Sequence, residues 1–244
     1  MAESRPAAAR SALESIVTRL PGGEQRDGQL DMCEAVAVAL ESGEHLVVEA
    51  GTGVGKSLAY LVAAVLSDRR VVIATARKPL QDQLIRKDIP FVASALPGRV
   101  DAAVLKGRSN YLCLAKLAEA QGGAQAELGF DRREDVFGRL GKWAQTTESG
   151  DLAGAPEPLT RELRSAVTVS SQECPGAKEC PQGEECLAER ALDWARDAAL
   201  VVTNIDLYCL DMAIGGGLLG EHDAVVVDEA HELESIASRA LGLE

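Results

Sequence analysis

The amino-acid sequence predicts an α/β fold in which a parallel sheet, flanked by helices, is interrupted by an inserted and mostly helical module. Apolar runs of strand length alternate with stretches of helical spacing up to about position 106, and this alternation resumes near position 197. Between those positions strand signals become scarce and turn-forming residues frequent. We therefore expect three stretches, 1–106, 107–196 and 197–244, of which the first and the last share one sheet.

Each element of the expected sheet can be placed from its own pattern. Residues 71–75 read Val-Val-Ile-Ala-Thr, an unbroken apolar run that is typical of a parallel strand buried on both faces. Similar runs predict four more strands, at 46–50, 100–105, 198–203 and 224–227. Helical spacing predicts helices at 11–20, 24–40, 57–66, 80–87, 205–212 and 233–241.

The charge of the chain argues against a generally basic nucleic-acid-binding protein, because the formal net charge of the 244 residues is −13. The charge is uneven, however. Residues 68–108 contain nine Lys and Arg against four Asp, a local excess of five positive charges. Such a zone on an acidic body can still attract a phosphate backbone.

Composition also bears on the cellular compartment. The first ten residues lack the apolar segment of a secretory signal. The longest apolar run, 58–66, is far shorter than the roughly 18 residues that a membrane-spanning helix needs. We therefore expect a cytoplasmic protein without a membrane partner. In that compartment six cysteines indicate metal or redox chemistry instead of structural disulfides.

A glycine-rich turn lies between the strand expected at 46–50 and the helix that follows it. Residues 49–57 read Glu-Ala-Gly-Thr-Gly-Val-Gly-Lys-Ser, which matches the P-loop except that Ala50 replaces its first glycine. Backbone N–H groups of such a loop hold phosphates at a helix N-terminus, Lys56 reaches the β- and γ-phosphates, and Ser57 binds Mg²⁺. The residues expected to hold ATP here are Gly51, Thr52, Gly53, Val54, Gly55, Lys56 and Ser57.

An acidic pair, Asp228 and Glu229, ends the strand expected at 224–227. P-loop proteins place a Mg²⁺-binding acid and an acid that activates the attacking water at such a position. An acidic turn after a strand is common, so this signal is weak alone and strong beside a P-loop. The sequence therefore predicts ATP hydrolysis with Mg²⁺ held by Ser57 and Asp228.

Four cysteines belong to the expected insertion: Cys113, Cys174, Cys180 and Cys186. Four thiolates satisfy either zinc or an iron–sulfur cluster. Zinc ribbons favour pairs separated by two to four residues, and the spacing here is five, so the pattern favours a cluster and leaves zinc open. Cys33 and Cys209 lie in apolar stretches, and we expect them to be buried thiols.

These motifs resemble those of XPD/DinG-type helicases, the iron–sulfur branch of superfamily 2. Residues 228–231 read Asp-Glu-Ala-His, the tetrad of DEAH helicases. Residues 26–32 are similar to the family's Q-motif, and residues 75–84 resemble motif Ia, with Arg77 in place of the second Thr. Residues 106–113 look like the entry to the family's cluster domain, and residues 202–204 like its return. Together the matching stretches extend from 26 to 231.

The resemblance implies a RecA-like sheet, a [4Fe–4S] cluster on the four cysteines of the insertion, and ATP with Mg²⁺ as the fuel. It adds His231 to Lys56, Asp228 and Glu229 as catalytic residues, and Arg26 with Gln29 as adenine-binding residues; a carboxamide such as that of Gln29 can pair with adenine N6 and N7. The residues implied to contact DNA are Thr75, Arg77, Lys78, Gln81, Lys106 and Arg108.

The function implied is an ATP-dependent DNA helicase with 5′→3′ polarity that acts on single-stranded and forked DNA, as in DNA repair. Family members also carry a second RecA-like domain, and the chain contains no match to it, so we expect an N-terminal fragment that hydrolyses little ATP by itself. Two alternatives stay open. One is a non-enzymatic nucleotide-binding iron–sulfur sensor, and the other is the helicase-like core of a nuclease.

Overall fold

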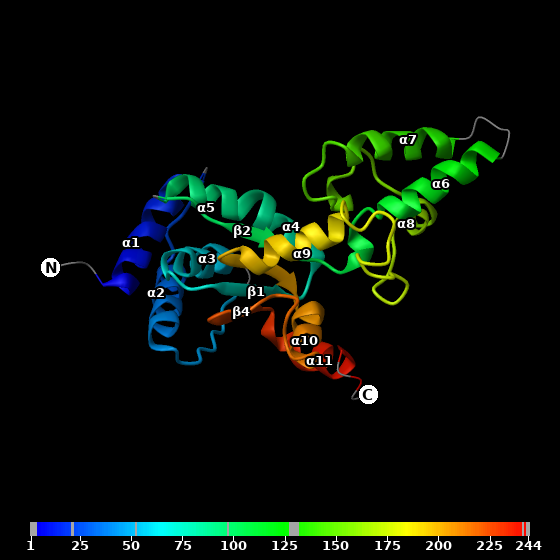
Figure 1. The fold of residues 1–244 in the computed structure, drawn as a ribbon. Helices are drawn as coiled ribbons and strands as arrows, with labels where there is room; N and C mark the ends of the chain where they lie inside the picture. Colours follow the sequence, from blue (N-terminus) through cyan, green and yellow to red (C-terminus); the bar gives the residue numbers. More distant parts are fainter. Residues whose placement is uncertain are drawn as a thin grey trace. The chain divides into compact units, whose positions relative to one another are not determined.

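A computed structural model describes residues 4–20, 22–51, 53–96, 98–126, 132–240 and 242, without the side chains of 123–126 and 132–135. Its residues divide into two compact units (Figure 1). The sheet unit comprises Met1–Val104 and Ala195–Glu244, and the cysteine unit comprises Leu105–Trp194. Within the described part of the chain, no helix has both the length and the apolar character needed to cross a membrane.

The sheet unit is built on four parallel strands, β1 (Val71–Thr75), β2 (Ala102–Val104), β3 (Leu200–Asn204) and β4 (Ala224–Asp228). Their order across the sheet is β2-β3-β1-β4. Thr75 at the end of β1 lies opposite Asn204 on one side and Asp228 on the other, so three strands end at the same edge. The predicted α/β class with a parallel sheet is confirmed.

Helices cover both faces of this sheet. They are α1 (Arg5–Thr18), α2 (Asp27–Ser42), α3 (Lys56–Leu66), α4 (Lys78–Gln83), the π-helical η1 (Leu84–Asp88), α5 (Ile89–Ala95), α10 (Ile205–Ala213), the short η4 (Ala230–Glu232) and α11 (Leu233–Ala240). Because side chains alternate along a strand, Val71 and Ile73 join a core with α1, α2, α3 and α5, whereas Ala74 packs with α10 and α11. Leu241, expected to end the last helix, lies outside the described residues.

The strand predicted at 46–50 is wrong, because these residues form neither a strand nor a helix. Val47 is 95% exposed, and Leu46 and Val48 are exposed as well. A strand needs a neighbour that accepts and donates its backbone hydrogen bonds. β4 is the last strand on its side of the sheet, and no described residue pairs with its outer edge. An apolar run predicts burial but cannot reveal that a neighbouring strand is missing.

The cysteine unit has helices and turns but no described strand beyond an isolated bridge between Tyr111 and Asp151. Its elements are η2 (Arg108–Asn110), α6 (Leu114–Ala126), α7 (Arg132–Ala144), η3 (Leu152–Gly154), α8 (Arg161–Val167) and most of α9 (Leu187–Asp197). A separate apolar core joins Leu112, Leu117, Phe137, Leu140, Leu152, Val167 and Leu187, among others. Phe130, an aromatic of this stretch, falls outside the described residues.

Candidate nucleotide site and four-cysteine pocket

The glycine-rich loop has the backbone that a phosphate-binding turn needs. Gly53 and Gly55 both have positive φ, 81° and 85°, and Gly55 immediately precedes the first residue of α3. A Cβ atom on Gly55 would also come within 2.3 Å of the Gln29 side-chain nitrogen, so a larger residue would displace the Gln29 amide from the loop. Lys56 and Ser57 therefore begin a helix whose free N–H groups face the loop. Thr52 lies outside the described residues.

The acidic pair reaches the P-loop lysine, although about 170 residues separate them in the chain. Lys56 Nζ lies 3.7 Å from Glu229 Oε1, and both side chains are partly exposed. His231 Nδ1 lies 3.5 Å from the other carboxylate oxygen of Glu229. Glu229 has a φ of 60°, a left-handed conformation that a glutamate adopts rarely. The fold thus brings together Lys56, Glu229 and His231, which the sequence predicts as catalytic residues.

Asp228 is held from two sides. Its Oδ2 accepts a hydrogen bond of 3.0 Å from the hydroxyl of Tyr60, and its Oδ1 accepts one of 3.0 Å from the backbone N–H of Glu229. Tyr60 is completely buried. Burial disfavours the charged form of a phenol. Burial is therefore the main cause, and the charge of Asp228 the second, of a pKa of Tyr60 that is far above its ordinary value. Tyr60 therefore keeps its proton and donates a hydrogen bond to the carboxylate.

Arg26 and Gln29 of the Q-motif both contact the P-loop. Gln29 Nε2 donates to the Gly55 carbonyl at 2.8 Å, and Arg26 donates to the Gly53 carbonyl. Gln29 lies on the first turn of α2 and is buried, whereas Arg26 precedes the helix and is exposed. Both side chains consequently support the loop that they flank.

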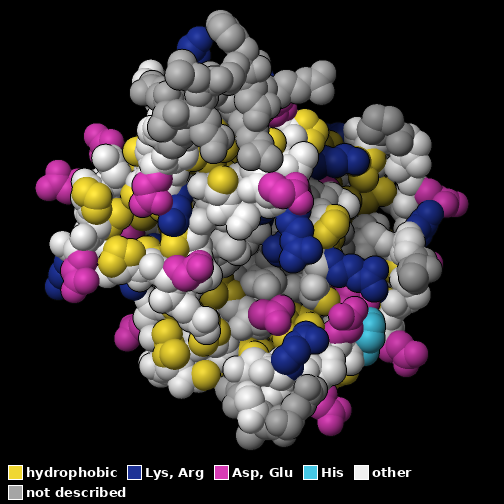
Figure 2. Space-filling view, turned by 90° about the vertical axis from the view of Figure 1, so that its right-hand side faces the viewer, with side chains coloured by type: hydrophobic (Ala, Val, Ile, Leu, Met, Phe, Trp, Pro, Cys, Tyr) yellow, Lys and Arg dark blue, Asp and Glu magenta, His cyan; other side chains and the backbone are white. Residues whose placement is uncertain are grey.

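The four expected DNA contacts from the sheet unit separate into two kinds. Thr75 and Gln81 are buried, and Gln81 Nε2 is a buried side-chain nitrogen without a hydrogen-bond partner. Arg77 and Lys78 are exposed. Arg77 Nη2 lies 3.6 Å from Oε1 of Glu232, which follows Glu229 by three residues. Figure 2 shows one face of the molecule, on which basic side chains lie beside acidic ones.

Lys106 and Arg108, the expected DNA contacts in the cysteine unit, are paired with protein groups. Lys106 Nζ lies 2.7 Å from Asp151 Oδ2, and the two side chains are only 4% and 7% exposed. Arg108 donates to the sulfur of Cys174 at 3.7 Å and to the carboxylate of Glu189. These placements do not support a DNA contact by Lys106 or Arg108. They indicate structural roles, because each cation already has a partner in a partly or fully buried environment.

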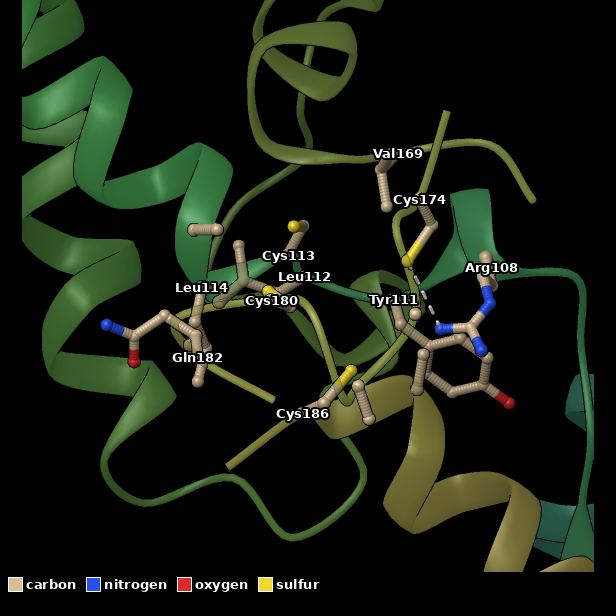
Figure 3. A pocket seen from close by; sticks show the side chains of 14 residues that line it. Arg108, Tyr111, Leu112, Cys113, Leu114, Val169, Cys174, Cys180, Gln182 and Cys186 are labelled. Carbon is tan, nitrogen blue, oxygen red and sulfur yellow. Dashed lines mark hydrogen bonds between the residues drawn. The ribbon is translucent and has the colours of Figure 1, made fainter. Parts of the chain in front are cut away.

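All four cysteines of the insertion line one pocket: Cys113, Cys174, Cys180 and Cys186. Figure 3 shows their sulfur atoms around a common space, with Arg108 extended toward Cys174. Cys113 immediately precedes α6. Burial raises the pKa of the Cys113 thiol, and the backbone N–H groups of Lys116 and Ala115 partly offset that rise.

The segment that carries the other three cysteines is a series of turns. The N–H groups of Cys174, Cys180 and Cys186 donate to the carbonyls of Ser170, Gly176 and Gly183, respectively. Each turn thus closes at a cysteine. Gly183 is needed here because a Cβ atom would come within 1.8 Å of the Ala177 carbonyl oxygen.

Within the described residues, no group of three or more His, Cys, Asp or Glu side chains is gathered tightly enough to hold a single metal ion. Four half-buried cysteines around one pocket are nevertheless a donor set that fits a cubane cluster, in which each thiolate binds a different iron.

The remaining two cysteines are separate from this pocket, as the sequence predicts. Cys33 and Cys209 are buried in the sheet unit. Burial raises the pKa of Cys33 to about 12 and also raises the pKa of Cys209. Both therefore remain protonated and unreactive at neutral pH.

Several residues at these sites were not found from the sequence. Tyr60 had one usable signal, because a tyrosine inside an apolar helix needs a partner for its hydroxyl. Asp151 and Glu189 had none, since acids in loops and on helices are common and nothing marks the ones that face Lys106 and Arg108.

Proteins of known name are similar to nearly the whole chain, whereas no protein-family model matches it. The ATP-dependent helicase DinG of Mycobacterium tuberculosis (strain H37Rv) is 43% identical over 91% of this chain and 36% of its own length. The ATP-dependent DNA helicase YoaA of Escherichia coli (strain K12) is 40% identical over 93% of this chain and 36% of its own. The 3′-5′ exonuclease DinG of Bacillus subtilis (strain 168) is 34% identical over 98% of this chain and 26% of its own length.

These relatives confirm the resemblance to DinG-type helicases that the motifs indicate. The chain spans only about a third of the length of the relatives that it matches.

Proposed function

We propose that this chain is the ATP-binding part of an ATP-dependent DNA helicase of the DinG and YoaA kind. The observation that carries the proposal is the meeting of Lys56 with Glu229, and of α3 with Asp228, at the end of a parallel strand. Segments far apart in the sequence thus bring together the lysine and the acidic pair that P-loop enzymes use. The names of the relatives support ATP as the source of energy and DNA as the substrate.

The residues at the P-loop fit ATP and Mg²⁺. Gly53 and Gly55 give the loop its path, the start of α3 supplies N–H groups, and Ser57 with Asp228 would hold the metal ion, which supplies a positive charge on the phosphates. Lys56 neutralises phosphate charge. Its present partner is Glu229, so phosphate binding exchanges a carboxylate for a phosphate at Lys56 and releases Glu229. The released carboxylate can then orient a water molecule and accept its proton.

For the DNA, we propose that Arg77 and Lys78 contact backbone phosphates of single-stranded DNA, because they are exposed cations at the end of β1. Thr75 and Gln81 are buried, and the Thr75 hydroxyl donates to the Arg77 carbonyl. Arg77 is close to Glu232, just beyond the acidic pair, so DNA and ATP would act on neighbouring residues. The direction 5′→3′, forked DNA as substrate, a role in repair and a cytoplasmic location remain part of the proposal.

For the cysteine unit, we propose a [4Fe–4S] cluster bound by Cys113, Cys174, Cys180 and Cys186, within an inserted domain at about 107–196. The support is the shared pocket, which receives sulfur from the residue before α6, from the turn segment and from the residue before α9. A bound cluster supplies a cross-link among three segments. Arg108 donates to Cys174 and places a cation beside the thiolates, whose negative charge it offsets.

The test of the helicase proposal has two stages. The chain should bind ATP in calorimetry, more tightly with Mg²⁺ than without it. The whole protein should hydrolyse ATP faster with single-stranded DNA and should separate the strands of a fork with a 5′ overhang, not one with a 3′ overhang. Absence of nucleotide binding by correctly folded chain would refute the P-loop assignment, and nucleotide-independent strand separation would refute the helicase.

The relative named as an exonuclease gives a second candidate, a helicase-like core associated with nuclease activity in the whole protein. The same DNA substrates distinguish the two. End-labelled strands that are released intact indicate a helicase, whereas single nucleotides released from the 3′ end indicate a nuclease.

A further inference from the structure

Tyr60 is a polar residue in an apolar helix. Residues 58–66 of α3 are otherwise apolar, and Tyr60 is 1% exposed. A phenylalanine would fill the same space equally well, and a buried phenol needs a hydrogen-bond partner. The hydroxyl donates to Asp228 Oδ2 at 3.0 Å. The side chain's only chemical difference from phenylalanine is therefore directed at the acid that the proposed function assigns to Mg²⁺.

Two donors together determine how the Asp228 carboxylate lies. Tyr60 occupies Oδ2, and the backbone N–H of Glu229 occupies Oδ1. A carboxylate oxygen has two acceptor positions, so each oxygen of Asp228 can still accept one bond from a metal-bound water. With one position of each oxygen taken, rotation about the side-chain bonds would break a hydrogen bond. The carboxylate is thus oriented before any ligand arrives.

The place of Tyr60 in the helix explains why this orientation is useful. Tyr60 follows Ser57 by three residues and Lys56 by four, so it lies on the same helix face one turn further on. The hydrogen bond to Asp228 therefore joins the helix that carries one proposed Mg²⁺ ligand to the strand that carries the other. A change in the separation of Ser57 and Asp228 would stretch this bond.

We propose that Tyr60 is a positioning residue for the Mg²⁺ site, whose hydroxyl holds the Asp228 carboxylate at the distance and orientation that the P-loop helix requires. This inference rests on the proposed nucleotide site and adds a residue to it. Tyr60 does not touch the nucleotide. It acts through Asp228, so its removal should weaken the metal-dependent part of ATP binding and leave the metal-free part unchanged.

The test compares Tyr60→Phe with Tyr111→Phe, using a fluorescent ATP analogue and Mg²⁺ titrations. Tyr111 is an equally buried tyrosine in the cysteine unit, whose hydroxyl accepts the backbone N–H of Lys106, so it controls for the loss of a buried hydroxyl. Circular dichroism verifies that each variant is folded at the temperature used. Tyr60→Phe should raise the half-saturating Mg²⁺ concentration about five-fold or more, because a hydrogen bond to a charged group is lost. Tyr111→Phe should leave it at the wild-type value.

A double-mutant cycle with Asp228→Ala isolates the pair. In that background Tyr60→Phe should cause no further change in Mg²⁺ dependence. An unchanged Mg²⁺ dependence in Tyr60→Phe alone, or an equal weakening of metal-free and metal-dependent binding, would overturn the inference while the nucleotide site stands. Wild-type protein that binds no nucleotide would overturn the proposed function, and the inference with it.

Discussion

Lys56 in the sheet unit and Lys106 in the cysteine unit are both paired with a carboxylate, but the two pairs differ in geometry and burial. Lys56 is 3.7 Å from Glu229, with side chains 27% and 36% exposed, whereas Lys106 is 2.7 Å from Asp151, with side chains 4% and 7% exposed. In a loose, partly exposed pair, the lysine can exchange its carboxylate partner for a phosphate. A tight buried pair cannot separate without leaving a charge in the protein interior. Lysines from two sequence motifs thus serve different purposes.

The two units also differ in how far their folds depend on a bound ligand. All five residues of β1 are buried, and the sheet unit is held together by apolar packing on both faces, so its site residues are not needed for the fold. Among its described residues, the cysteine unit has a smaller apolar core, and it has a long segment of turns that carries three half-buried thiols. We infer that the sheet unit is stable without its ligand and that the cysteine unit depends on what its cysteines bind.

Replacing one cysteine should therefore have the largest effect. Cys113→Ser should remove the cluster from protein purified without oxygen, because serine oxygen binds iron of a cluster poorly. Wild-type protein should contain about four irons per chain and absorb broadly in the visible range. Cys33→Ser is the matched control and should keep both the iron content and the visible absorption. One zinc per chain, without iron or labile sulfide, would contradict the cluster.

Glu229→Gln should separate binding from catalysis in the sheet unit. The amide keeps the shape of the side chain but cannot accept a proton, so DNA-stimulated ATP hydrolysis by the whole protein should fall by about 10²- to 10⁴-fold. ATP affinity, measured by calorimetry, should stay the same or rise, since Lys56 loses its charged partner. A turnover rate equal to wild type would show that another group accepts the proton.

Lys106→Met should lower stability and leave the nucleotide site unaffected. Removing one partner of a buried ion pair leaves Asp151 uncompensated, which costs about 3–5 kcal/mol of the free energy of unfolding. Lys116→Met, which breaks the exposed pair with Glu119, should change it by about 0.5 kcal/mol or less. Denaturant unfolding provides both values. Equal effects of the two substitutions would disprove a structural role for Lys106.

Lys56→Ala should show the reverse pattern. The loss of a charge-assisted contact to phosphate should weaken ATP binding by about 1.5–3 kcal/mol, ten- to a hundred-fold, while the unfolding midpoint stays close to wild type. Calorimetry and thermal unfolding on the same preparation measure both. A variant that binds ATP as tightly as wild type would mean that Lys56 does not contact phosphate.

The sequence predicts well those features that depend on neighbours in the chain. Val71–Thr75 is a strand as predicted because its unbroken apolar run identifies it, and the P-loop is recognisable because Gly53, Gly55 and Lys56 are close in sequence. The strand predicted at 46–50 is wrong because a strand also depends on a neighbour in space. The motif that contains Lys106 implies a contact with DNA, but a motif records residue types and not burial, and the partner Asp151 is 45 residues away.

The central claim is that the two units depend differently on their ligands, and hydrogen exchange tests it most directly. Protein purified without oxygen is compared before and after removal of iron with a chelator, and amide protection is followed peptide by peptide. We predict that protection falls within Leu105–Trp194 and stays unchanged in β1, β3, β4 and α3. Unchanged protection throughout, or an equal loss in both units, would contradict the claim.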